Sequence, residues 1–572
     1  MKVDAGNAFS READDRDPRS VRIVRQRAMD HVCGAGGRYE TAMEVVNGVK
    51  LPVFVQRHRS VVDLLDEAVA RFADRAFMSL NGHTCSYAAA AEASESIART
   101  LAERQGVRPG DRVAIFAANS PDWFLTFWAT MRLGAIACAF NGWWTGEEAR
   151  YAIDLVDPVV LLADAGRAAR LTDGPLEVPL LDVARDAAAK GTSSDQARPS
   201  NVSVDEDAAA LLLFTSGTTS KPKSALISHR GVVGFVQTHL CNAAIGARVV
   251  ADASDGPESP TSPSIAQSTL LLTSPLFHVS GLLGGMMMAA VAGTHVVMRS
   301  GRFDPADVLH LIETHGVTNW SPLGATGARV LRDPSFSPER VHTVRQIGFG
   351  GGPTTPARRL EILHAFPNAS LSVSNGYGST ETVATATSIS GSEYDRNPRA
   401  AGRALPTVEV EIWDDEDRML EDDQLGRVMV RSAYRFLGYW NSPEASAAVL
   451  RRDGFLDRGD FGRLVDGLLT IDSRARDMII RSGENVSPLE VEAVLESHPA
   501  VAEAAVVAVD HDEHGQEVAA VVVPKAELEV VELEAFCAAR LAAYKVPARW
   551  VLRAEPLPRN AAGKVVKREL EG

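Results

Sequence analysis

Short apolar segments alternate with helical patterns along most of the chain before residue 474. In the clearest unit, an apolar strand at 113–117 is followed by Ser120 and Pro121, a favoured helix start. An apolar helix then extends to Gly134, and a second apolar strand follows. This order predicts a βαβ unit, in which a helix joins two parallel strands and covers their sheet.

The same apolar pattern predicts further strands at 158–164, 209–214, 268–275 and 408–414. Strands separated by helical segments favour a largely parallel sheet covered by helices. We therefore expect an α/β fold, with a large N-terminal domain of layered sheets and helices built from βαβ units.

The C-terminal segment changes character and predicts a small α+β unit. Residues 487–499 predict a helix capped by Ser487, residues 501–510 and 516–525 predict strands, and residues 530–542 predict an amphipathic helix. A charged segment at 472–478 joins this unit to the rest of the chain.

The N-terminal segment mixes both charge signs and has no apolar signal core. We expect the chain to divide into four parts: a disordered or loosely attached arm at 1–40, an N-terminal domain at 41–474, a hinge at 475–477 and a mobile lid at 478–572.

Composition narrows the class of protein. The 572 residues are 45% hydrophobic and 23% charged, as in soluble globular proteins, and the net charge is -15. A negative charge of this size argues against a nucleic-acid partner held through its phosphates. The most apolar run, 282–293, is shorter than the roughly 20 residues that span a bilayer.

The five cysteines occur singly, without the spacing of a metal site or a disulfide framework. This pattern favours a reducing, cytoplasmic setting. The cysteines are Cys33, Cys85, Cys138, Cys241 and Cys537.

The segment FTSGTTSKPKSALISH, residues 214–229, predicts a phosphate-binding loop. It follows an apolar strand directly and combines consecutive small residues with Lys221 and Lys223. Backbone N–H groups in such a turn form an anion nest, to which hydroxyls and lysines add donors and charge. The spacing is not that of a Walker loop. Taken alone, a segment of this composition is more often a plain turn.

Five further segments follow this loop in order: IGFGGGP (347–353), NGYGSTET (375–382), DGFLDRGD (453–460), DSRARDMIIRSGENVSP (472–488) and PRNAAGKVVKREL (558–570). Together with the loop they resemble the adenylate-forming superfamily, which includes acyl-CoA synthetases, adenylation domains and luciferases. The resemblance extends from about residue 60 to the C-terminus. It implies ATP, Mg²⁺ and coenzyme A as cofactors.

The resemblance implies a nucleotide site. Tyr377 would stack on adenine, Asp460 would accept hydrogen bonds from the ribose hydroxyls, and Arg474 would add a positive donor nearby. Thr215 and Glu381 would hold Mg²⁺. The implied nucleotide-binding residues are Thr215, Ser216, Gly217, Thr218, Thr219, Lys223, Gly351, Gly352, Pro353, Gly376, Tyr377, Gly378, Ser379, Thr380, Asp460 and Arg474.

The resemblance also assigns catalytic roles. Lys564 would bridge the attacking carboxylate and the α-phosphate, Glu381 would act through the metal, and His278 would gate the acyl carboxylate. The lid would rotate about a hinge at Arg476, and Ser482, Gly483 and Glu484 would border the path of coenzyme A. Each residue alone is also typical of an ordinary turn, helix start or core position; their joint order favours the site.

The acid is expected to be hydrophobic. Residues 282–293 and 319–325 would form the wall of its pocket, because small residues and adaptable methionines suit a broad apolar ligand. Neither segment contains a lone charged residue that would indicate an amino-acid substrate.

Several residues depart from the family pattern. Ser220 and Ser224 stand where glycine is usual, and serine at a positive φ would be strained by about 1 kcal/mol. Arg427, Arg458 and Ser473 stand where glutamate, threonine and glycine are usual.

These departures leave two readings open within the class. The protein is either a full acyl-CoA ligase or a member that transfers a supplied acyl-adenylate to coenzyme A, with a separate adenylating enzyme as partner. A luciferase-like oxygenase shares the first step. A non-enzymatic regulator is disfavoured because Lys564 is present, and a homodimer is compatible with all of these.

Overall fold

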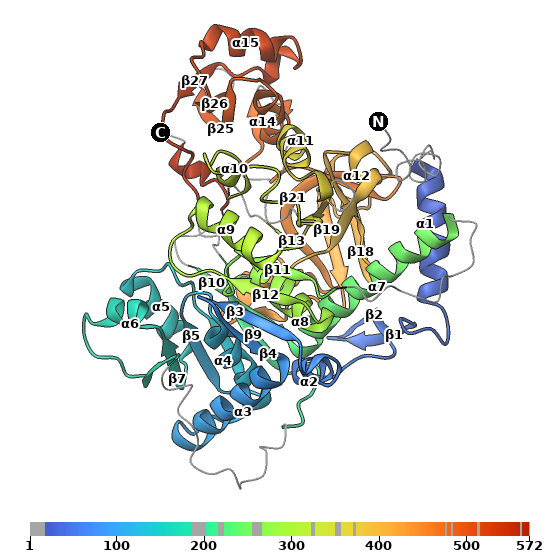
Figure 1. Ribbon diagram of the computed structural model, residues 1–572. Coiled ribbons are helices and arrows are strands. Elements are labelled where there is room, and N and C mark those ends of the chain that lie inside the picture. Colours follow the sequence, from blue (N-terminus) through green and yellow to red (C-terminus); the bar gives the residue numbers. More distant parts are fainter. Residues whose placement is uncertain are drawn as a thin grey trace, which may run out of the picture.

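The computed structural model describes residues 18–184, 202–215, 222–253, 266–321, 326–348, 356–369, 373–474, 477–481, 484–511, 515–560 and 563–570. Its elements form two large sheets, a small hairpin and a separate C-terminal sheet (Figure 1). This arrangement confirms the expected large α/β N-terminal part with a smaller C-terminal unit.

One large sheet contains the strands that lead toward the phosphate loop. Its strand order is β20 (Gly438–Tyr439), β10 (Lys223–Ser228), β9 (Ala209–Thr215), β6 (Ile136–Ala139), β5 (Arg112–Phe116), β7 (Val160–Ala163) and β8 (Leu180–Asp182).

The predicted βαβ unit is confirmed in this sheet. Strands β5 and β6 are parallel and are joined by α4 (Pro121–Arg132). The Ser120 side chain accepts a hydrogen bond from the Trp123 N–H and Pro121 opens the helix, as the sequence predicts.

The other large sheet carries most of the remaining motifs. Its order is β18 (Val408–Trp413), β19 (Gly426–Ser432), β21 (Phe455–Val465), β22 (Leu468–Arg474), β17 (Ala400–Ala404), β16 (Thr387–Ser390), β15 (Val373–Tyr377), β14 (Gln346–Gly348), β13 (Asn319–Trp320), β11 (Thr269–Leu272), β12 (His295–Met298), β3 (Ala76–Leu80) and β4 (His83–Ser86).

Within this sheet, β3, β12, β11, β13, β14 and β15 pair in parallel, whereas β15 to β22 pair antiparallel. The antiparallel part sets the strands that carry Asp460 and Arg474 side by side, because Asp460 on β21 pairs with Arg474 on β22.

Helices cover both large sheets. The longer ones are α2 (Val61–Phe72), α3 (Tyr87–Arg104), α5 (Gly146–Val156), α7 (His229–Ala253), α9 (Pro305–His315) and α11 (Pro356–Ala365), and the shorter ones are α6 (Ala165–Ala168), α8 (Met288–Ala292), α10 (Thr326–Leu331), α12 (Gly391–Arg396) and α13 (Pro443–Ala447). Of the helices that the structure describes, none has the length and apolar character to cross a membrane.

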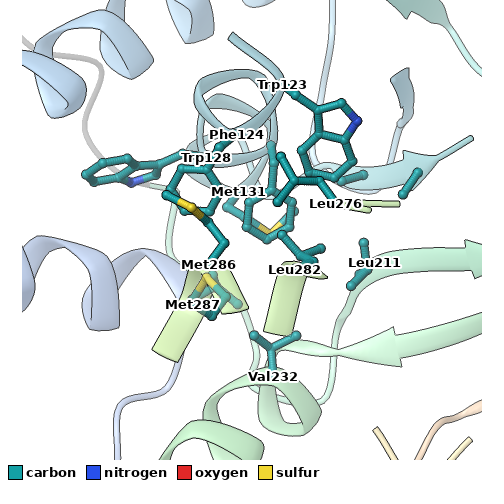
Figure 2. Close-up of a cluster of buried hydrophobic side chains, with 14 of the residues drawn as sticks. Trp123, Phe124, Trp128, Met131, Leu211, Val232, Leu276, Leu282, Met286 and Met287 are labelled. Carbon is teal, nitrogen blue, oxygen red and sulfur yellow. The ribbon is translucent and has the colours of Figure 1, made fainter. Parts of the chain in front are cut away.

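The main core lies between the two sheets. The α4 side chains Trp123, Trp128 and Met131 pack toward Leu282, Met286 and Met287 of the π-helix η2 (Ser280–Met287) (Figure 2). Each of these six side chains is at most 1% exposed. The π-helix is therefore fixed along one face by aromatic packing.

The N-terminal region differs from the expected loose arm. Residues Pro18–Val32 form helix α1, which packs against α7 (Figure 1). Ala28 is 1% exposed, and the Arg25 guanidinium donates to the Asn242 side chain at 2.5 Å. A hairpin of β1 (Thr41–Val46) and β2 (Val49–Phe54) follows.

All five cysteines are free thiols. The sequence places them singly, but the fold brings Cys33 Sγ and Cys241 Sγ to 3.4 Å from each other. This contact joins the end of α1 to α7.

The C-terminal unit is the small α+β body that the sequence predicts. Strands β23 (Ile479–Arg481), β24 (Glu484–Val486), β25 (Val501–His511), β26 (Gly515–Pro524) and β27 (Arg549–Leu552) form its sheet, and α14 (Pro488–Glu496) and α15 (Val530–Ala538) pack against it. Ser487 caps α14. In Figure 1 this unit stands at one end of the molecule, beside α10 and α11.

Candidate active site

A line of contacts runs from the flank of the phosphate loop to Glu381. Thr215 ends β9 opposite Lys223 on β10, and its hydroxyl donates to the Lys223 carbonyl at 3.4 Å. The Lys223 ammonium lies 5.4 Å from the centre of the Tyr439 ring. The Tyr439 hydroxyl in turn donates to the Glu381 carboxylate at 2.5 Å. Tyr439 was not singled out by the sequence.

A strained turn holds Glu381. Val383 and Ala384 have φ values of 53° and 79°, which are unfavourable for a β-branched residue and for alanine. Gly378 admits the close approach of this turn, since a Cβ there would lie 1.8 Å from the Ala384 carbonyl oxygen. The Glu381 carbonyl accepts from the Phe436 N–H at 2.9 Å. Glu381 is thereby buried, at 1% exposure, in a fixed position.

The Arg458 guanidinium forms an ion pair with Glu381. The side chains are 18% and 2% exposed, so this pair is largely shielded from water. Arg458 was recognised from the sequence only as a departure from the family pattern. Its contact with Glu381 depends on the packing of β21 beside the turn at 380–384 and has no local sequence signal.

Tyr377 on β15, the implied adenine residue, comes together with the implied ribose residues Asp460 on β21 and Arg474 on β22. The Tyr377 hydroxyl donates to Asp460 Oδ2 at 2.7 Å, and Arg474 Nε donates to Asp460 Oδ1 at 3.1 Å. Asp460 is 4% exposed. Burial, together with the Asp460 carboxylate, raises the pKa of Tyr377 well above its usual value, so the phenol stays protonated and keeps donating.

These residues and Arg458 form one group. The positive charges of Arg458 and Arg474 both act on the Tyr377 phenol. Thr380, which is 8% exposed, immediately precedes Glu381. The described residues Lys223, Tyr377, Thr380, Glu381, Arg458, Asp460 and Arg474 therefore form one group, in which the cationic side chains of Lys223, Arg458 and Arg474 accompany the buried carboxylates of Glu381 and Asp460.

His278 and Lys564 form the second part of the site. Burial and the positive charge of Lys564 lower the pKa of His278 to about 4, so the imidazole is neutral at neutral pH. Its Nδ1 lies 2.9 Å from the Ser280 hydroxyl. The charge of Lys564, on the C-terminal unit, thus acts on the histidine of the N-terminal part.

The turn that carries Lys564 is held rigidly on the C-terminal unit. Asn560 and Lys564 exchange hydrogen bonds, because Lys564 N–H donates to Asn560 Oδ1 at 3.0 Å and Asn560 N–H donates to the Lys564 carbonyl at 2.9 Å. Gly563 has a φ of +76° in this turn. Arg559 donates to the Gly563 carbonyl and pairs with Glu503 at 3.0 Å.

The strain expected at Ser224 is absent. Ser224 lies in β10, pairs with Phe214 and has no positive φ, so its extended backbone accepts serine without cost. It is 0% exposed, and among the described residues its hydroxyl has no hydrogen-bond partner. The expectation was wrong because the loop has already become a strand at this position.

Two other departures have structural roles. Arg427 pairs with Asp417 and Asp457, each at 2.6 Å, and so ties β19 to β21. Ser473 is 3% exposed in β22 and lies opposite Phe461. Neither residue contacts Glu381 or Asp460 in the described structure.

The expected acyl wall has only one accessible face. Most apolar side chains of 282–293 are buried in the core shown in Figure 2. The positions of 280–292 that are not buried are Ser280, Gly284, Gly285, Met288 and Ala292, and four of them recur at intervals of four residues. A Cβ at Gly284 would meet only the Val279 carbonyl oxygen, at 4.0 Å.

Some predicted site residues lie outside the described residues: Ser216, Gly217, Thr218, Thr219, Ser220, Gly351, Gly352, Pro353, Arg476, Ser482 and Gly483. Of the other predicted residues, Gly376 lies on β15 and Ser379 donates and accepts hydrogen bonds with Thr382. Glu484 is exposed at the start of β24, opposite Arg481.

The larger α/β part, the smaller C-terminal unit and the buried tyrosine–aspartate–arginine group agree with the adenylate-forming class that the sequence motifs resemble. The AMP-binding enzyme family matches residues 65–440, and the AMP-binding enzyme C-terminal domain matches residues 490–564. The chain belongs to this family, which confirms the resemblance seen in the sequence motifs.

Two curated relatives are CoA ligases for very different acids. The chain is 32% identical to indoleacetate–CoA ligase of Aromatoleum aromaticum, over 84% of this chain and 92% of the relative. It is 29% identical to oxalate–CoA ligase of Arabidopsis thaliana, over 88% and 96%.

The fold is also similar to o-succinylbenzoate CoA synthetase from Bacillus subtilis. Its complex with an acyl-adenylate intermediate matches with a TM-score of 0.73 and 29% identity, over 89% of this chain and 98% of that one. Its complex with ATP and a magnesium ion matches with a TM-score of 0.72 and 28% identity, over 89% and 99%.

Proposed function

We propose that this protein is an ATP-dependent acid–CoA ligase that converts a hydrophobic carboxylic acid to its CoA thioester through an acyl-adenylate. The observation that carries the proposal is the charge of Lys564 acting on the buried His278, together with the hydrogen-bonded Tyr377–Asp460–Arg474 group. The named ligase activities of the relatives and the acyl-adenylate complex of the similar structure support it.

In the first step, an acid oxygen attacks the α-phosphorus of ATP and pyrophosphate leaves. Lys564 is the cation that stabilises the negative charge gathering between the carboxylate and the phosphate. The neutral imidazole of His278 adds no second positive charge beside this lysine. Asp460, held by Tyr377 and Arg474, accepts from the ribose hydroxyls.

In the second step, the thiol of coenzyme A attacks the acyl carbon and AMP leaves. We propose that the unit 478–572 turns about a hinge at 475–477, which includes Arg476, and so withdraws Lys564 between the steps. Glu484, with Ser482 and Gly483, would then border the path of coenzyme A.

A hydrophobic acid is supported by the face of Ser280, Gly284 and Met288. The segment 280–292 contains no charged side chain, and Gly284 leaves open space for an acyl group. The acids named for the relatives, indoleacetate and oxalate, differ too much to select one for this chain.

Magnesium is supported as a cofactor by the similar structure that binds ATP with a magnesium ion. Mg²⁺ is usually held in proteins by one or two carboxylates together with substrate phosphates, and we propose that Thr215 and Glu381 contribute to its site. In the described structure the Glu381 carboxylate is paired with Arg458, so no step is derived through a metal on Glu381.

The proposal is tested by incubating the protein with ATP and a panel of aromatic and aliphatic acids, and measuring acid-dependent pyrophosphate release. Thioester formation on adding coenzyme A is then followed by mass spectrometry. Thioester formed only from a synthetic acyl-adenylate would instead support the transfer-only alternative.

A further inference from the structure

Two cysteines that lie far apart in the sequence meet where α1 packs against α7. Cys33 directly follows α1 and Cys241 lies within α7, and their Sγ atoms are 3.4 Å apart. Cys241 is fully buried, whereas Cys33 is only half-buried. Among the described residues, Cys85, Cys138 and Cys537 have no second thiol beside them. The fold therefore makes a pair from two cysteines that the sequence shows as single residues.

The two thiols of this pair differ in acidity. The hydrogen bond between the sulfurs lowers the pKa of Cys33, which fits the Cys241 S–H as its donor. The same hydrogen bond, together with burial, raises the pKa of Cys241. The thiolate is the reactive form of cysteine, and redox-sensitive cysteines are typically acidic, accessible and next to a second cysteine. Cys33 has the properties of the reacting thiol and Cys241 those of its partner.

A bond between the two sulfurs needs only a small movement. Sulfurs in a disulfide are about 2.05 Å apart, so the Sγ atoms must approach each other by roughly 1.3 Å. Cys33 leads into the segment 34–37, which contains three glycines, and Gly36 has a φ of +78°. Such a segment adjusts readily, because glycine has few backbone restrictions. Beside the pair, the hydrogen bond from Arg25 to Asn242 keeps α1 on α7.

The pair joins a segment outside the family match to the family core. The match to the AMP-binding enzyme family begins at residue 65, so Cys33 precedes it and Cys241 lies inside it. Helix α7 begins at His229, directly after β10, which carries Lys223. A covalent bond between the two cysteines would therefore tether the N-terminal helix to the helix that follows the phosphate-loop strand.

We propose that Cys33 and Cys241 form an oxidative modification site, at which a hydroperoxide such as hydrogen peroxide produces a disulfide that tethers α1 to α7. The Cys33 thiolate attacks one peroxide oxygen and the O–O bond breaks, which leaves a sulfenic acid on Cys33. The released hydroxide takes up the proton that Cys33 lost and becomes water.

The second step closes the bond. The Cys241 sulfur attacks the Cys33 sulfur, the S–O bond breaks, and the hydroxyl leaves as a second water with the Cys241 proton. The two thiols together lose two electrons, and the peroxide gains them.

The bond is expected to be reversible. The pattern of cysteines favours a reducing setting, in which protein disulfides are usually transient and redox-sensing. A thiol reductant returns both residues to thiols by exchange. Neither cysteine belongs to the candidate active site, so this modification site is independent of the proposed ligase activity.

The test detects the bond directly in the full-length protein. The protein is reduced with dithiothreitol, transferred to buffer without reductant, exposed to hydrogen peroxide, alkylated and digested with trypsin. We expect mass spectrometry to find the tryptic peptides 28–38 and 231–248 linked to each other. Their combined mass should be two hydrogens below the sum of the separate peptides, and dithiothreitol should separate them.

Three variants check the two roles. Cys33→Ser and Cys241→Ser should each prevent the linked peptide. In Cys241→Ser the sulfenic acid of Cys33 has no partner, so dimedone should trap it. Cys85→Ser is the matched control, because Cys85 is also half-buried but burial raises the pKa of its thiol; this variant should keep the link.

The tether should also restrain α1. Hydrogen–deuterium exchange is compared between the reduced and the oxidised protein. We expect amide exchange in α1 to slow by about tenfold or more on oxidation, because the disulfide prevents openings that separate α1 from α7. In Cys33→Ser the peroxide treatment should leave the exchange of α1 unchanged.

Two results would overturn the proposed site. In one, the oxidised unaltered protein gives no link between 28–38 and 231–248, and both cysteines are recovered as alkylated thiols or as singly oxidised residues. In the other, the link forms only between two copies of the chain, seen as a dimer in non-reducing gel electrophoresis. A link without slower exchange in α1 would overturn the tethering role. Because the unaltered protein alone decides these outcomes, a variant that fails to fold does not block the test.

Discussion

The effect of the Lys564 charge on His278 leads to a prediction with a magnitude. The pKa of His278 is about 4, against an ordinary value of 6.5, and burial is a larger cause of this difference than the Lys564 charge. The lysine therefore accounts for less than half of the difference. In Lys564→Gln, we expect the pKa of His278 to rise by less than half of that difference, because burial is retained.

The pKa is measured by NMR on protein with labelled histidines, with His278→Gln used to assign the signal. The free energy of unfolding should also depend on pH through His278. Since the folded protein keeps His278 neutral, the unfolded chain binds its proton more readily, and this group lowers stability as pH falls from about 6.5 to about 4. An unchanged His278 pKa in Lys564→Gln would refute the placement of the lysine; a rise to 6.5 would refute the burial.

Three further predictions concern other parts of the site. Tyr377→Phe should lower the free energy of unfolding by about 1.5–3 kcal/mol in chemical denaturation, because it removes a buried hydrogen bond to Asp460. Tyr394→Phe is the control, since among described residues that hydroxyl has no partner. In the same assay, Ser224→Gly should lower the free energy of unfolding by about 0.5–1 kcal/mol because glycine is unfavourable in a strand, and Ser224→Ala should leave it unchanged. A higher free energy of unfolding in Ser224→Gly would instead show that serine is strained at this position. Gly284→Leu should raise KM for bulky acids by roughly tenfold while sparing small ones, and equal effects on both would exclude this acyl face.

Much of the fold was predictable because local signals agree with it. Ser120 and Pro121 begin α4, and Ser487 caps α14, as hydroxyl caps and an N-terminal proline do generally. The apolar runs at 209–214 and 408–414 became β9 and β18 with end shifts of one residue. The helix α1 was missed because its burial comes from α7, far along the chain.

The site was predictable only as a set of motifs. Tyr377, Asp460 and Arg474 meet as the family order implies, but the partner of Glu381 is set by which strand packs beside its turn. Ser224 was misjudged for a related reason: the residue type suggested a strained loop, whereas the ladder with Phe214 makes it an extended strand residue.

The most direct test of the account compares the two half-reactions in the unaltered protein and in Lys564→Ala. The account predicts acid-dependent pyrophosphate release by the unaltered protein, a loss of about a hundredfold or more in Lys564→Ala, and thioester formation from a supplied acyl-adenylate that stays close to the unaltered rate. Equal loss of both half-reactions, or no pyrophosphate release from any acid by the unaltered protein, would contradict it.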